Sequence, residues 1–369
     1  MFRSAVLCIV AALLAIPDAS FADAHDEQNA TAAEKATPSA GPRKRGRKEK
    51  PQPAAQEPSP AERSSLDGNT LGWAVRHAGE MSEANIALMM GLQDIRLEKP
   101  LNLSRERSAK QIAGAFASVG QCRVQTMPAY AFVYVPGYEQ LTDISLTGQL
   151  PSKYREITGS IAFGSGMPLY AALAWMGHAL NVTLVADNAV GDAQCGEIAL
   201  AHASVQDALE AMLKSARVVT VTIEATEEYV LLRSPANANP PSALLNADRL
   251  DAASKALLDK RIDVYLPQRS KDPARFPLRF AASRLDSVLG TLSEQAAAPI
   301  TAEKDVQGLP VNPVTLRNVR VATAMDLLVR QWLAPEFGYD AIQGSIHIRR
   351  RGAAERIAPA AGTASASTP

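Results

Sequence analysis

The sequence has little of several features that mark common classes of protein. Aromatic residues make up only 5% of the chain, which gives few side chains for the stacking platforms of single-strand binders. The 38 Lys and Arg residues balance the 38 Asp and Glu residues, so the chain is not basic throughout, although a local basic patch remains open. Three Cys and five His residues are too few and too scattered for a structural metal array.

The chain also lacks the short motifs of common enzymes. It has no G-x-S-x-G, no H-E-x-x-H, no P-loop and no C-x-x-C. Gly164-Ser165-Gly166 is only superficially like a phosphate cradle, because it lies between an expected strand and an expected helix. We therefore predict no catalytic, cofactor-binding or metal-ligating residue, no cofactor and no enzymatic activity. An envelope enzyme with a site dispersed over the chain is a second hypothesis, and the missing nucleophile argues against it.

The N-terminus has the pattern of an export signal. A short basic start at Arg3 precedes the apolar run Ala5 to Ile16, and Ser20-Phe21-Ala22 supplies small residues at the −3 and −1 positions. The sequence predicts a signal peptide over 1–22, cleaved after Ala22, and a periplasmic protein with outer-membrane association left open. An uncleaved anchor is the alternative, but the run is shorter than the roughly 20 residues that span a bilayer. We expect no transmembrane segment in the mature chain.

Two cysteines, Cys122 and Cys195, remain in that mature chain. In an oxidising compartment they form a candidate disulfide, although the sequence does not show whether they lie close together.

Two segments lack the residues of a core. Residues 23–67 form a predicted disordered linker rich in Pro, Ala and basic residues, and 353–369 form a predicted disordered tail. The linker carries a candidate site for anionic surfaces, made of Arg43, Lys44, Arg45, Arg47, Lys48 and Lys50. Behind an export signal, this tract would contact anionic lipid, cell wall or an acidic partner. A solvated spacer is the alternative.

The rest of the chain contains an internal repeat. A gapless shift of 116 residues pairs Leu169 with Leu285 and Val230 with Ile346. A weaker copy lies upstream, at a shift of 98 that pairs Leu71 with Leu169 and then a shift of 97 that pairs Val133 with Val230. We name the predicted domains unit 1 (68–147), unit 2 (156–236) and unit 3 (262–352), with a connecting helix over 244–261.

Each unit is predicted to be a small α+β domain of order β-α-β-β-α-β-β. Leu169, Leu173 and Met176 form one stripe of an amphipathic helix. Ser204 is an N-cap candidate for a second helix, and two closing strands follow as a hairpin. Two helices packed on a small mixed sheet would bury such a unit, and three units would form a tandem array.

The unit resembles the short N-terminal domain of secretins and of TonB-dependent receptors. The resemblance is good over 156–236, fair over 261–351 and weak over 68–147, and it rests on Met167-Pro168-Leu169, Leu173, Asn181 to Asp187, Val190-Gly191 and Ser204 to Leu213. In those families a pore or a membrane barrel follows, but no run of alternating strands of that size follows unit 3. The resemblance therefore implies an array of such domains that is not itself the pore.

These observations favour a non-catalytic protein that binds other proteins. An exposed edge strand can accept a strand from a partner, and like domains can pack into rings, so a homo-oligomer is one expectation. The resemblance implies an accessory of a secretin-type secretion system or a type IV pilus, with a secretin or an inner-membrane component as partner. A DNA-binding or cell-wall-binding envelope protein that uses the basic 43–50 tract is the alternative, and export argues against nucleic acid as the partner.

Overall fold

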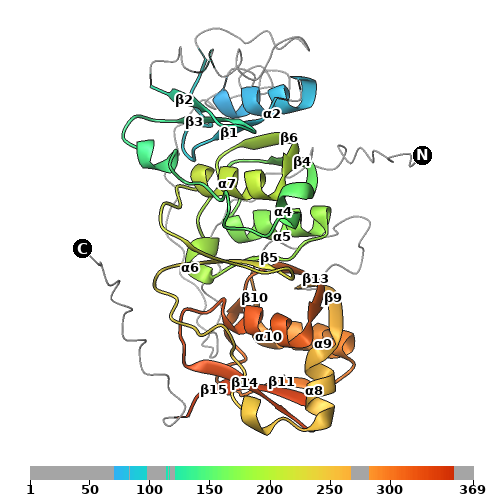
Figure 1. Ribbon diagram of the computed structural model, residues 1–369. Helices are drawn as coiled ribbons and strands as arrows, with labels where there is room; N and C mark the ends of the chain where they lie inside the picture. Colours follow the sequence, from blue (N-terminus) through green and yellow to red (C-terminus); the bar gives the residue numbers. More distant parts are fainter. Residues whose placement is uncertain are drawn as a thin grey trace, which may run out of the picture. The chain divides into compact units, whose positions relative to one another are not determined.

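The computed structural model describes residues 70–82, 84–97, 114, 116, 121–266 and 282–352, all within the compact part of the chain from Glu57 to Pro369 (Figure 1). These residues form eight α-helices and several small mixed sheets, which confirms the α+β class. None of the described helices is long and apolar enough to cross a membrane. The predicted signal peptide, the basic tract and the C-terminal tail lie outside the described residues.

The main elements of unit 2 follow the predicted order, with one short helix, α6, that was not predicted. Leu169, Leu173 and Met176 are buried on α5, and the side chain of Ser204 accepts a hydrogen bond from the amide of Asp207, 3.0 Å away, as an N-cap. The elements are β4 (Thr158–Phe163), α5 (Leu169–Leu180), β5 (Leu184–Ala186), α6 (Asn188–Gly191), β6 (Ile198–Ser204), α7 (Val205–Ser215), β7 (Thr222–Ala225) and β8 (Val230–Arg233).

Unit 3 has the same order of main elements, with additional short strands. It contains β9 (Arg261–Leu266), β10 (Ser283–Arg284), α9 (Leu285–Ala296), β11 (Ile300–Ala302), β12 (Pro310–Val311), β13 (Val314–Arg320), α10 (Val321–Val329), β14 (Phe337–Ile342) and β15 (Ser345–Arg350). The described part of unit 1 contains α2 (Leu71–Ser82), β1 (Ile86–Leu88), β2 (Arg123–Thr126) and β3 (Ala131–Tyr134). Between units 1 and 2 lie the 3-10 helix η1 (Glu139–Leu141) and α4 (Lys153–Glu156).

The backbone of units 2 and 3 repeats at the shift found in the sequence. Leu184 of β5 pairs with Val230 of β8 in parallel, and Ile300 of β11 pairs with Ile346 of β15 in parallel, so both partners move by 116 residues. A β-bulge also recurs, with positive φ angles of 54° at His202 and 50° at Asn318.

The prediction of one small mixed sheet per unit is wrong, because the strands of unit 2 divide between two sheets and one of these sheets continues into unit 1. One five-stranded sheet has the order β2-β3-β1-β6-β4, because β1 of unit 1 pairs antiparallel with β6 of unit 2. This pairing satisfies backbone groups that two separate sheets would leave at open edges. One hydrophobic core accordingly serves units 1 and 2, and a second core in unit 3 includes Val185 and Leu231 of unit 2.

The connecting helix is shorter than predicted. Instead of one helix over 244–261, the chain forms the 3-10 helix η2 (Ala247–Arg249) and α8 (Ala252–Asp259). Asp251 starts α8 because its side chain accepts a hydrogen bond from the amide of Ser254, 2.8 Å away. Residues 243–245 instead run along β14, where the backbone of Tyr339 bonds to Ala243 and Leu245.

Candidate functional site

The two candidate disulfide cysteines are free, buried thiols in this structure. Cys122 lies next to β2 and Cys195 lies shortly before β6, with β3 and β1 between these two strands. Three strand spacings amount to about 14 Å, whereas the Cα atoms of a disulfide are at most about 7 Å apart. The sheet order therefore keeps the two thiols apart.

Both thiols should react slowly with alkylating reagents in the folded protein. Burial raises the pKa of Cys195 to about 12 and also raises the pKa of Cys122, so little reactive thiolate is present at neutral pH. We expect both to be alkylated at pH 8 only after unfolding, as measured by mass spectrometry of time points with and without denaturant. A disulfide-linked peptide containing both cysteines would contradict this account.

The basic tract from Arg43 to Lys50 lies outside the described residues, so the structure does not place it. Among the described residues, no cluster of three or more His, Cys, Asp or Glu side chains could hold a metal ion. The feature that the structure does bring together is the pair of junctions between neighbouring units.

One hydrogen bond from a backbone amide to a side chain recurs at matching positions of the two junctions, whereas the pairing of β1 with β6 has no counterpart among the described strands of units 2 and 3. Between units 1 and 2, the amide of Leu88 donates to the carbonyl of Glu197 over 2.8 Å, and the amide of Ala201 donates to the side chain of Asn85. Between units 2 and 3, the amide of Arg317 donates to Thr183 Oγ1 over 2.8 Å. Asn85 and Thr183 are 98 residues apart, and Ala201 and Arg317 are 116 apart, the two shifts of the sequence repeat.

The helix contacts of the junctions also recur. A Cβ atom at Gly79 of α2 would lie 2.6 Å from Ala199 Cβ on β6, and one at Gly177 of α5 would lie 3.3 Å from Thr315 Cβ on β13. These positions are again 98 and 116 residues apart. A small residue on the first helix of each unit therefore lets the strand of the next unit approach closely.

The second helix of each following unit carries an acid and a base four residues apart. Glu210 of α7 accepts a hydrogen bond from the amide of Leu146 over 3.2 Å and pairs with Lys214 over 3.0 Å. On α10, Asp326 accepts a hydrogen bond from the amide of Ala243 over 2.6 Å. In both junctions the acid holds the linker that enters its own unit.

The base of each pair contacts the closing hairpin of the preceding unit. Lys214 lies 5.8 Å from the ring centre of Tyr130, and Arg330 Nη1 donates to Glu224 Oε1 over 2.8 Å. The side chains of both bases are 0% exposed. A buried charge is costly unless it is paired. Arg330 finds its partner in Glu224 of the preceding hairpin, whereas Lys214 pairs with Glu210 of its own helix and donates to the carbonyl of Thr142.

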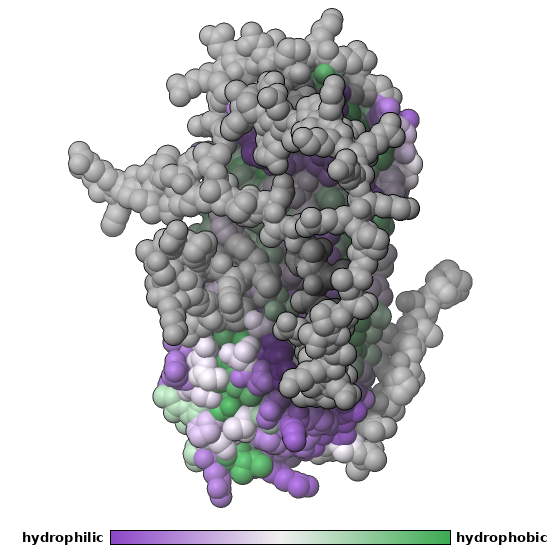
Figure 2. Space-filling view, turned by 180° about the vertical axis from the view of Figure 1, so that it is seen from behind, coloured by the Kyte–Doolittle hydropathy of each residue, from purple (hydrophilic) through white to green (hydrophobic). Residues whose placement is uncertain are grey.

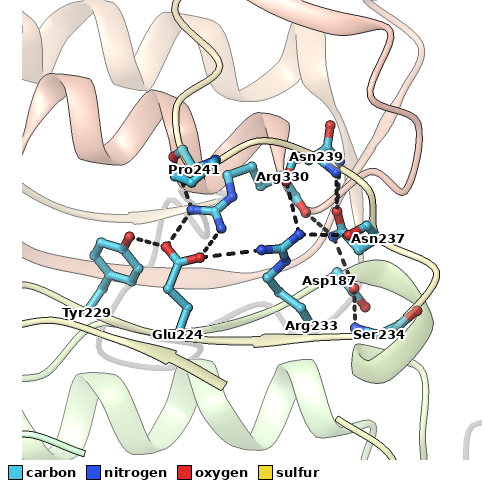
Figure 3. A network of polar contacts seen from close by, with 9 residues as sticks. All are labelled: Asp187, Glu224, Tyr229, Arg233, Ser234, Asn237, Asn239, Pro241 and Arg330. Carbon is cyan, nitrogen blue, oxygen red and sulfur yellow. Dashed lines mark hydrogen bonds and ion pairs between the residues drawn. The ribbon is translucent and has the colours of Figure 1, made fainter. Parts of the chain in front are cut away.

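Figure 3 shows the larger of these networks. The hydroxyl of Tyr229 donates to Glu224 Oε1 over 2.5 Å, and Arg233 pairs with Glu224 over 3.5 Å. Arg233 also donates to the carbonyl oxygens of Asn237 and Asn239, at 2.7 and 3.0 Å. Arg233 thus holds the linker after unit 2, and its partner Glu224 receives Arg330.

This network keeps the carboxylate of Glu224 in its charged form. Burial alone would raise the pKa of Glu224, but hydrogen bonds from Arg330 and Tyr229 and the charges of Arg330 and Arg233 outweigh it and hold the pKa below its ordinary value. A carboxylate stabilised in its charged form by two guanidinium groups is a poor proton acceptor. The arrangement therefore supports binding between units 2 and 3.

Asp326 gives the second junction a dependence on pH. Burial raises the pKa of Asp326 to about 6, although the amide of Ala243 and the charge of Arg330 act in the opposite direction. The folded state therefore binds a proton more tightly than the unfolded state, whose carboxyl has a pKa near 3.9. Its contribution to stability rises as pH falls from about 7 through 6 and is lost again as pH rises.

We expect Asp326→Asn to remove the rise in stability that Asp326 gives as the pH falls through 6. Comparison of urea unfolding between pH 7.5 and 5 should show the wild-type chain gaining stability on acidification relative to the variant. Exposed Asp286→Asn is the control and should leave the pH profile unchanged. Parallel profiles for the wild type and Asp326→Asn would contradict the role of this carboxyl.

The sequence reasoning missed these charged pairs. Glu210 with Lys214 and Asp326 with Arg330 are both acid-base pairs four residues apart, and they lie 116 residues from one another. That recurrence was the sequence signal for these pairs. A charged residue kept at the same position of a repeated amphipathic helix is stronger evidence of a shared contact than one apolar residue, because many apolar residues recur for packing alone.

Comparisons with protein-family models, with curated proteins and with solved structures found no match to the chain.

Proposed function

We propose that units 1, 2 and 3 are copies of one small domain, and that the chain is a non-catalytic periplasmic array that binds other proteins. The observation that carries this proposal is the repeated junction. Contacts at matching positions of the first helix, of one backbone amide and of a buried cation recur between units 1 and 2 and between units 2 and 3, and strands β1 and β6 also pair between units 1 and 2. Strand pairing and buried polar contacts of this kind are typical of domains that bind other proteins.

The proposed setting is an envelope assembly, as an accessory of a secretin-type secretion system or of a type IV pilus. The resemblance of 156–236 to secretin N-terminal domains supports this choice, together with the export pattern of residues 1–22. The proposed partners are a secretin or an inner-membrane component of the same assembly. The basic tract at 43–50 gives the alternative, binding to DNA or cell wall.

Affinity capture tests the proposal. The full chain with a C-terminal tag, expressed in a bacterium that exports it, is cross-linked in cells and purified from the envelope. Secretin, pilus or inner-membrane secretion proteins should be enriched over a tag-only control, and a variant without residues 41–50 should capture them equally well. Recovery of only cell wall or nucleic acid, lost in that deletion variant, would overturn the proposal in favour of the alternative.

A further inference from the structure

The outer strand of the unit 2 hairpin, β7, is an open edge in the described part of the chain. In the three-stranded sheet of order β5-β8-β7, the amide of Val230 donates to Thr183 and the carbonyl of Leu232 accepts from Asp187. The backbone amide and carbonyl groups of Val230 and Leu232 thus point to β5. Their neighbours in β8, Leu231 and Arg233, pair with Glu224 and Thr222 of β7. The amide and carbonyl of Ile223 therefore point away from the sheet.

No hydrogen bond joins either of these backbone groups to another residue that the structure describes. The residues at the start of β7 suit a strand partner. Residues 218–221, which precede β7, and its first two residues, Thr222 and Ile223, are all β-branched and uncharged, and Val219 is 47% exposed. The next residue of the strand, Glu224, is already paired with Arg330. Natural proteins usually blunt such an edge with charge, proline or a covering segment.

The equivalent edge in unit 3 has such a covering segment. Tyr339 of β14 lies 116 residues after Ile223, and its amide donates to Ala243 over 3.0 Å while its carbonyl accepts from Leu245 over 2.8 Å. Leu244 pairs with Tyr339 in parallel. The fold thus already adds an extended segment at this position of the repeat, and at β7 no described residue fills the corresponding place.

The geometry points to β7 as the site where a partner protein adds an extended, uncharged segment to the sheet. This inference rests on the proposed function and names the binding surface for it. The partner's main chain would bond to the amide and carbonyl of Ile223, and its side chains would lie beside Val219, Val221 and Thr222. Residues 218–223 carry no charge, and Glu224 of β7 is already paired with Arg330 and Arg233. A charge in the added segment would be desolvated without a free opposite charge, so the segment is rich in Val, Ile and Thr.

One detail restricts how the segment binds. A Cβ at Gly338 of β14 would lie 2.6 Å from the carbonyl oxygen of Ala243, so glycine allows residues 243–245 to approach β14 closely. Thr222 stands at that position in β7. A strand added to β7 must therefore leave room for the Cβ of Thr222 and pair at the ordinary strand spacing of about 4.8 Å.

Figure 2 shows one face of the molecule, on whose coloured part hydrophobic residues are interspersed with hydrophilic ones.

A displayed library of random peptides of about ten residues, a typical strand length, is the probe. Panned on the full chain, it should yield uncharged peptides rich in Val, Ile and Thr, and each should slow amide exchange at Ile223 at least about tenfold. Ile223→Pro removes the outward amide and should weaken binding at least about tenfold. Val124→Pro, at the matching outward position of β2, is the control and should bind as the wild type does.

Thr222→Lys is a second variant, which adds a charge at an exposed edge position without altering a backbone bond. It should also lose peptide binding. Selected peptides that leave Ile223 exchange unchanged, or that bind both variants as well as the wild type, would overturn the inference. Protection of Ile223 that instead depends on protein concentration would overturn it too, because the occupant would then be a second copy of the chain.

The two proposals fail separately. If envelope capture succeeds equally for the wild type and Thr222→Lys, the proposed function stands and β7 is not its binding surface. If peptides bind at β7 but no secretion or pilus protein is captured, the edge is a binding site and the proposed assembly is wrong.

Discussion

Replacing Arg330 with methionine should lower the free energy of unfolding by about 3–5 kcal/mol, the usual cost of removing one partner of a buried ion pair. The Arg330 side chain is 0% exposed and lies against Glu224. Methionine fills much of the same volume but leaves the carboxylate of Glu224 with fewer partners in a half-buried position. Urea unfolding at pH 7 measures the loss.

Two further variants show whether the charge is the cause. Arg320→Met removes a cation that contacts Glu228 across the same junction, but Arg320 is 50% exposed, so we expect a change of no more than about 1 kcal/mol. Arg330→Met combined with Glu224→Leu removes both charges and should recover much of the stability. A double variant that is less stable than Arg330→Met alone would show that packing, and not an unpaired charge, sets the cost.

Gly196→Ala should weaken the junction between units 1 and 2. A Cβ at residue 196 would lie 2.1 Å from the carbonyl oxygen of Leu88 and 2.8 Å from the amide of Met90. Both atoms belong to the backbone, so β1 must move away from β6. Overpacking of this kind costs about 1–3 kcal/mol or more, and limited proteolysis between the units should become faster.

Gly164→Ala is the matched control. A Cβ at residue 164 meets no atom within 4 Å, and its backbone has no positive φ. We expect the free energy of unfolding to stay within about 0.5 kcal/mol of the wild type. The rate of proteolysis between the units should not change. If Gly196→Ala behaved like Gly164→Ala, the close approach of β1 to β6 would not hold in solution.

The helices of unit 2 were predictable from local patterns. The apolar stripe beginning at Leu169 gave α5, and Ser204 marked the start of α7, because an amphipathic period and a cap are both contained in a short stretch of chain. The shift of 116 residues was visible for the same reason, since buried positions stay apolar when a unit is repeated.

The alignment of the first closing hairpin was less accurate. The structure matches β2 and β3 to β7 and β8 at a shift of 99 residues, Arg123 to Thr222 and Tyr134 to Arg233, whereas the sequence suggested 97. Side chains alternate along a strand, so a slip of two residues keeps every apolar residue on the same face. Hydrophobic pattern alone does not separate these two registers.

The junctions were beyond prediction from sequence. Pairing of β1 with β6 joins residues more than a hundred positions apart, and no local signal selects one edge strand over another. Lys214 and Arg330 read as ordinary solvent-exposed charges on amphipathic helices until the preceding hairpin is placed against them. A helix pattern tells which side faces its own core, but not what covers the opposite side.

The repeated junction is the central claim, and amide exchange at Ala201 and Arg317 tests it most directly. Both amides bond to a side chain of the preceding unit, Asn85 or Thr183. The account predicts that both are protected in the full chain, that Asn85→Ala releases only Ala201, and that Thr183→Val releases only Arg317. Exchange of either amide in the wild type at the rate of an exposed loop would contradict the claim that this contact recurs at both junctions.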